Sequence, residues 1–136
     1  MNKQRKIFSI NLVLVVLVMT LGYSDMAHAA VPKRIPNRTK TTYVGSTKVY
    51  MEIGCNNGTY VYALVSASND VDVVMEMTLY YNNGQEQKEI MGGFDQRTYG
   101  EMEYTCSSRV SKMECYITIS SEDAGETFYL PLTIPE

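Results

Sequence analysis

Three cysteines are the residues of this sequence whose spacing most directly suggests chemistry, and that chemistry is a disulfide. Cys106 and Cys115 lie nine positions apart around a polar run, whereas Cys55 lies far upstream. If the flanking segments form a hairpin that opposes Cys106 and Cys115, their α-carbons are about 4.5–5.5 Å apart, within the reach of a disulfide. Two alternatives stay open: a bridge from Cys55 to one of the other two, or three reduced thiols packed as small apolar side chains.

The sequence offers little for other catalytic chemistry. Its only histidine, His28, lies in an N-terminal segment that we expect to be removed. Without it the chain lacks the commonest general base and the usual partner of a nucleophilic thiol. Zinc is not expected either, because there is no C-x-x-C motif. We therefore predict that the protein is not an enzyme and holds no metal or cofactor.

Acidic residues recur in three places. Glu101 and Glu103 lie two positions apart on one expected strand face, about 7 Å from each other, which suits a glycosidase pair on separation alone. A solvated strand face is the simpler explanation. The turns "SASNDVD" (66–72) and "SSEDAGE" (120–126) are rich in oxygen ligands, but they lack the order and spacing of a calcium loop.

Tyrosine is the feature that points toward a function. The chain has 11 Tyr and no Trp. On the strand faces opposite the main apolar stripes we expect Tyr50, Tyr60, Tyr62, Tyr80 and Tyr116. Exposed Tyr suits a binding surface, because the ring gives contact area at low entropic cost and the hydroxyl forms hydrogen bonds. Tyr also has a high strand propensity, and cross-strand Tyr pairs stabilise a wet sheet face without any ligand.

The elements that must position these residues are short strands. The chain after about residue 42 alternates with a period of two in runs rich in Val, Ile, Thr and Tyr, broken by turn residues. The expected strands are 43–54, 59–67, 71–81, 85–91, 99–107, 112–120 and 126–134. Their number and spacing predict an all-β fold, an antiparallel β-sandwich of about seven strands or a barrel-like relative of it.

Some strand positions and registers can be predicted in more detail. A three-residue loop at 56–58 would pair Ile53 with Val61 and collect the small apolar side chains on one face. The segment 85–91 is polar on both faces, as an edge strand should be. Pro131 cannot donate to a strand ladder, so the last strand should also be an edge or be bulged there.

The N-terminal part is expected to be a targeting segment. A basic start, an apolar run of 16 residues and the "AHA" motif that ends at Ala29 are typical of a cleaved signal peptide over 1–29. The apolar run is shorter than the roughly 20 residues of a membrane span. Residues 30–41 are expected to be a flexible basic lead-in segment, and 42–136 a single domain.

Charge narrows the choice of partners. From Thr41 onward five Lys or Arg face fourteen Asp or Glu, a formal net charge of −9. Such a body should repel nucleic acid. We therefore expect a small secreted, non-catalytic protein, bacterial in character, which binds a protein or glycan or has a structural role at the cell surface or outside the cell. The alternative is a secreted effector, toxin or antimicrobial protein.

Overall fold

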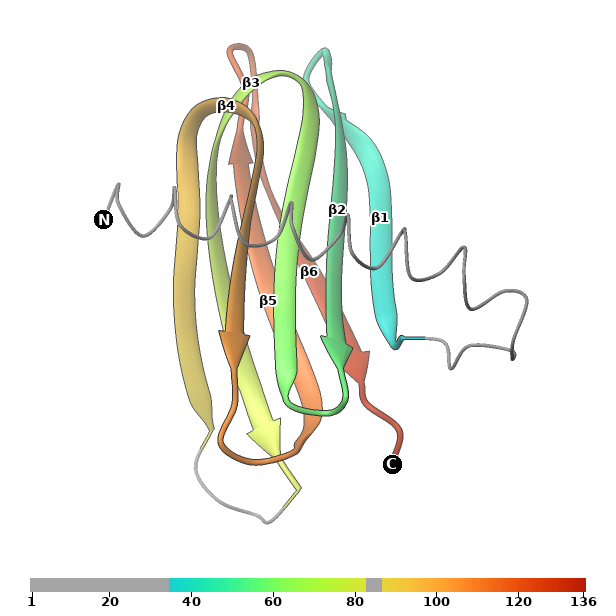
Figure 1. Ribbon diagram of the computed structural model, residues 1–136. Coiled ribbons are helices and arrows are strands. Elements are labelled where there is room, and N and C mark those ends of the chain that lie inside the picture. Colours follow the sequence, from blue (N-terminus) through green and yellow to red (C-terminus); the bar gives the residue numbers. More distant parts are fainter. Residues whose placement is uncertain (1–34, 83–86) are drawn as a thin grey trace, which may run out of the picture.

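The computed structural model describes residues 35–82 and 87–136, so the expected signal peptide lies outside the described residues. The described part is all-β and contains six strands and no helix (Figure 1). The strands are β1 (Asn37–Val44), β2 (Thr47–Asn56), β3 (Tyr60–Tyr81), β4 (Lys88–Thr105), β5 (Val110–Ser120) and β6 (Gly125–Thr133). This confirms the prediction of an antiparallel all-β fold.

The six strands belong to one antiparallel sheet that folds back on itself. Its order is β1-β2-β3-β5-β6, and β4 pairs with β3. The first half of β3 lies between β2 and β4, and its second half lies between β4 and β5. The two end strands, β1 and β6, contact each other, so the sheet is nearly closed and barrel-like (Figure 1).

Two of the expected gaps between strands do not exist. Segments 59–67 and 71–81 form the single strand β3, and β4 runs from Lys88 through the expected turn to Thr105. Both strands bend together, with register shifts between Ser66 and Val73. At this bend Gln96 adopts a positive φ, and its backbone N–H donates to Oδ1 of Asp72 at 2.8 Å. A bulge of this kind turns a strand without ending its pairing, and for this reason turn-like residues are found inside a strand.

The core lies between the two halves of the folded sheet. On the second half of β3 every odd-numbered residue from Val71 to Leu79 is buried, as the alternation predicts. These side chains pack against the buried side chains of β2, the first half of β3, β5 and β6. One face of each half therefore points inward, and the two outward faces lie on opposite sides of the core.

The first hairpin has the predicted faces but a different register. Ile53 pairs with Ala63 instead of Val61, because the loop comprises residues 57–59 rather than 56–58. Asn57 and Gly58 both adopt a positive φ, and the backbone N–H of Thr59 donates to the carbonyl of Asn56. The shift is two residues in pairing, so the parity is unchanged and the same side chains face the core.

The expected hairpin that opposes Cys106 and Cys115 is wrong. β4 and β5 do not pair with each other; they flank β3, and Cys115 lies opposite Met77 of β3 and Leu130 of β6. The link between β4 and β5 crosses the end of β3, where the N–H of Cys106 donates to the carbonyl of Thr59. All three cysteines are buried free thiols. The disulfide prediction is therefore not met for Cys106 and Cys115, nor for the alternative partner Cys55.

The sheet begins earlier in the chain than predicted. Strand β1 begins at Asn37, so residues 37–41 of the expected lead-in segment belong to the sheet, paired along β2. Most of β1 is exposed, which explains why its sequence lacks an apolar stripe.

The two segments expected at edges of the sheet are at its edges. β4 pairs only with β3, and β6, which contains Pro131, ends the strand order of the described sheet.

Candidate functional site

The five predicted tyrosines do not form one surface. Tyr50, Tyr60 and Tyr62 lie on the outward face of β2 and the first half of β3. Tyr80 and Tyr116 lie on the outward face of the second half of β3 and of β5. Because these two faces are on opposite sides of the core, the predicted face separates into two candidate surfaces.

The more exposed surface is an apolar strip on the second half of the sheet. Among the described residues the strongly exposed large apolar or aromatic side chains are Tyr43, Val74, Met91, Tyr116 and Tyr129. All except Tyr43 lie on this outward face. Glu76 pairs with Met91 on one side and with Tyr116 on the other, and Tyr116 pairs with Tyr129. We call Val74, Met91, Tyr116 and Tyr129 the tyrosine strip.

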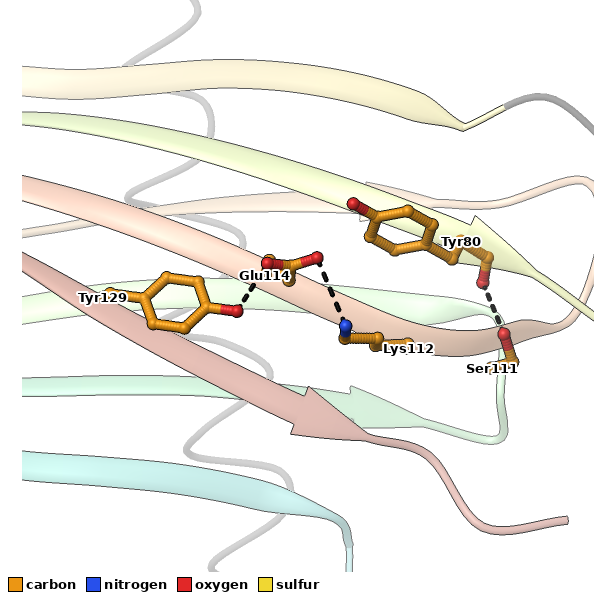
Figure 2. A network of polar contacts seen from close by, with 5 residues as sticks. All are labelled: Tyr80, Ser111, Lys112, Glu114 and Tyr129. Carbon is orange, nitrogen blue, oxygen red and sulfur yellow. Dashed lines mark hydrogen bonds and ion pairs between the residues drawn. The ribbon is translucent and has the colours of Figure 1, made fainter.

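A carboxylate fixes the aromatic end of this strip. The Tyr129 hydroxyl donates to Oε2 of Glu114 at 2.5 Å, and Nζ of Lys112 lies 3.4 Å from Oε1 of Glu114 (Figure 2). Hydrogen bonds from Tyr129 and Tyr80 hold the pKa of Glu114 below its usual value. The rings of Tyr116 and Tyr129 lie with their centroids 5.0 Å apart. The hydrogen bond, the ion pair and the ring contact thus hold the side chains at this end in place.

Polar side chains lie within the strip as well as around it, because Glu76 stands between Met91 and Tyr116. Thr118 and Thr127 share a hydrogen bond of 2.9 Å between their hydroxyls, and Glu76 and Lys112 are exposed beside the aromatic rings. The strip therefore mixes exposed aromatic and apolar side chains with charged and hydroxyl groups.

The second surface is more closely packed. We call it the tyrosine–glutamate face, and it consists of Tyr50, Glu52, Tyr60, Tyr62, Leu64, Tyr99, Glu101 and Glu103. Tyr62 and Leu64 are each 8% exposed and form a small apolar cluster of their own, outside the main core. The ring of Tyr62 lies over Gly54, where a Cβ atom would come within 2.4 Å of it.

The two acidic segments singled out in the sequence, the bend of β3 at 66–72 and the β5–β6 turn, meet at one end of the sheet. They line a cavity of about 810 Å³ that includes Asp70, Asp72, Glu122 and Asp123. Asp123 accepts a hydrogen bond from the backbone N–H of Ser46 at 3.2 Å, which joins the β5–β6 turn to the β1–β2 turn. Over residues 35–82 and 87–136, no group of three or more His, Cys, Asp or Glu is arranged to hold a metal ion.

The thiols do not form a reactive site. Burial raises the pKa of Cys55 to about 11 and that of Cys115 to about 12. The thiolate is the nucleophilic form of cysteine, so these groups are poorly reactive at neutral pH. They act as small core side chains.

Sequence reasoning missed Tyr129, Glu114 and Met91 as members of a surface. Tyr129 lies two positions before Pro131, and the prediction for this strand rested on the proline alone. Only the β5–β6 register shows that Tyr129 lies beside Tyr116. Val74 is an apolar residue on the outward, even-numbered side of β3, and it is 46% exposed.

No protein-family model matches this chain, and no curated protein matches it with significance. In the part of the chain that the structure describes, no helix is long and apolar enough to cross a membrane.

Proposed function

We propose that this protein is an exported, non-catalytic binding protein whose tyrosine strip engages a protein partner at the cell surface or outside the cell. The observation that carries the proposal is that four of the five strongly exposed large apolar or aromatic side chains among the described residues share one outward face. Single exposed apolar side chains are normal, but a contiguous group on one face is typical of an interaction site.

The composition of the strip favours a protein over a glycan. Tyr and Met are enriched at protein interfaces, and the strip presents both beside charged side chains. A sugar platform would need flat, accessible rings in similar planes, whereas the planes of Tyr116 and Tyr129 are tilted by 38°. Export is supported by the signal-peptide pattern of the sequence, and a non-catalytic role by the lack of histidine after residue 28.

The proposal can be tested by site-specific photo-crosslinking in cells that export the protein. A benzoylphenylalanine at position 116 or 129 should give covalent adducts with one protein partner. The matched control is the same substitution at Glu122, which is exposed in the β5–β6 turn and belongs to neither outward face. Val74→Ser should reduce the adduct at position 116 by about tenfold, because loss of an interface contact worth about 1.4 kcal/mol weakens affinity tenfold.

Equal labelling from position 122, or no protein adduct from position 116 or 129, would contradict the proposal. Binding to cellulose, chitin or peptidoglycan suspensions that Tyr129→Ser abolishes would replace the protein partner by a glycan.

A further inference from the structure

The tyrosine–glutamate face lies on the opposite side of the core from the tyrosine strip and carries a different kind of chemistry. The registers place Glu52, Leu64 and Glu101 in one row across three strands, and Tyr62 beside Glu103 in the next. Two strand spacings separate Glu52 from Glu101, about 9–10 Å between α-carbons. The carboxylates therefore stand around an apolar centre rather than at one point.

The carboxylates of this face are held by tyrosine hydroxyls. Tyr50 donates to Oε1 of Glu52 at 2.5 Å, and Tyr62 donates to Oε2 of the same carboxylate at 2.6 Å. Tyr60 donates to Glu103. Hydrogen bonds of this kind fix the position of a carboxylate without neutralising its charge. Glu101 is only 5% exposed, whereas Glu52 and Glu103 are half-buried, so these two carboxylates present oriented negative charge beside the rings.

The pKa values of the tyrosines on this face are raised, first by burial and then by the neighbouring carboxylates. Partial burial, the hydrogen bond to Glu52 and its charge raise the pKa of Tyr50 to about 12. Burial is the larger cause of a raised pKa at Tyr62 and Tyr99 too, followed by hydrogen bonds to Glu52 and Glu101. The geometry of the hydroxyl–carboxylate pairs and these pKa shifts agree.

Positive charge is scarce on this face. Among its described strand segments, 37–44, 47–56, 60–66 and 99–105, the only Lys or Arg on the outward side is Lys48, at one end. Elsewhere the molecule places lysines over aromatic rings: Lys40 over Phe128 at 5.6 Å, Lys88 over Tyr104 at 5.7 Å and Lys112 over Tyr80 at 5.4 Å. On the tyrosine–glutamate face four rings and three carboxylates accompany a single lysine.

We propose that the tyrosine–glutamate face is a second binding surface, which takes a polypeptide segment carrying Arg or Lys side chains. Rings supply cation–π contacts and carboxylates supply charge-assisted hydrogen bonds, and both favour a guanidinium above other groups. The carboxylates are spread across strands, so they match charges repeated along an extended segment. The complementarity of charge selects this occupant, because an anionic or purely apolar partner would bury Glu52 and Glu103 without bringing a countercharge.

The test uses calorimetric titration of the full-length mature protein with a synthetic peptide of alternating arginine and glycine. Its control peptide has citrulline, a neutral analogue, in place of arginine. The arginine peptide should bind, more weakly as salt rises, and the citrulline peptide should not. Glu52→Gln with Glu103→Gln should weaken binding about tenfold, since the site loses two oriented charges.

The matched control variant is Glu122→Gln with Glu126→Gln, which removes the same charge from the β5–β6 turn and the start of β6, outside both outward faces. It should leave the affinity unchanged within about twofold, as expected for residues far from the site. Equal weakening by both variants would show diffuse attraction to an acidic body and overturn the proposal, as would no binding at low salt.

If the Glu52 and Glu103 variant melts early, Glu103→Gln alone, on the edge strand β4, serves as the test variant. Salt-sensitive self-association that Glu103→Gln abolishes would replace the partner by a second copy of the chain.

Discussion

The thiol of Cys115 lies on β5 between Met77 and Leu130 on the neighbouring strands, in the main core. Cys55 and Cys106 are in the same core cluster, at the end of the sheet where β2 and β4 flank β3. Local spacing alone suggested that Cys106 and Cys115 oppose each other. Alternation along a strand determines which side of the sheet a cysteine faces. It does not determine which strand lies beside it, and here β3 and β6, not β4, are the neighbours of β5.

We predict three free and slowly reacting thiols. In the native protein, alkylation should be slow, because the thiols are buried and burial raises the pKa of Cys55 to about 11 and that of Cys115 to about 12. In denaturant without reductant, a thiol reagent should count all three. Mass spectrometry of iodoacetamide-treated protein measures both. A count of one after denaturation would show that two cysteines are joined.

At the scale of elements, the joint bend of β3 and β4 decides the fold. The bend brings the first and second halves of β4 close to each other at the rim of the core, where glycines make room for large side chains. A Cβ atom on Gly100 would come within 2.2 Å of the ring of Phe94, and one on Gly92 within 2.7 Å of the sulfur of Met102. Phe94 and Met102 are each 2% exposed. These glycines are therefore required by packing rather than by backbone angles.

Gly100→Ala should destabilise the protein by about 1–3 kcal/mol, because the new methyl group overpacks the buried Phe94 ring. The control is Gly125→Ala at the start of β6, where the nearest atom to a Cβ would be 3.7 Å away. That change should stay within about 0.5 kcal/mol. Urea unfolding of both variants measures the difference. Equal stabilities would contradict the packing role assigned to Gly100.

At the scale of the whole molecule, the folded sheet separates two outward faces of different character. One carries the exposed tyrosine strip, and the other carries tyrosines paired with glutamates. Tyr129 on the first face and Tyr50 on the second both have a pKa raised to about 12. The cause at Tyr129 is first the hydrogen bond to Glu114, and at Tyr50 first the burial of the hydroxyl.

These shifts predict a loss of stability in alkaline solution. A tyrosine whose pKa is higher in the folded than in the unfolded chain contributes stability that is fully present below the unfolded pKa of 10 and is lost as the pH rises toward 12. The melting temperature should therefore fall between pH 10 and pH 12. Absorbance at 295 nm should show tyrosinate forming later in the native protein than in denaturant. Coincident titration curves for the two states would contradict the prediction.

Much of the fold could be predicted from the sequence because β-structure repeats every two residues. The stripe from Val71 to Leu79 showed which side faces the core, and Pro131 marked an edge strand. The registers place the five tyrosines on outward strand sides, but on two separate faces, and Tyr62 is only 8% exposed. The sequence did not show that β3 and β4 are continuous strands. The residues between 67 and 71, and those between 91 and 99, look like turns but form bends inside these strands.

The sequence by itself determined the all-β class, the inward and outward sides of most strands and the scarcity of histidine chemistry, because these depend on local alternation and composition. Only the tertiary structure decided which strands are neighbours. It placed β3 between β4 and β5, separated Cys106 from Cys115, paired Tyr116 with Tyr129 and divided the tyrosines between two faces. The physical reason is that many apolar stripes of the same period can pair with one another, and the choice among them depends on bends and packing along the entire chain.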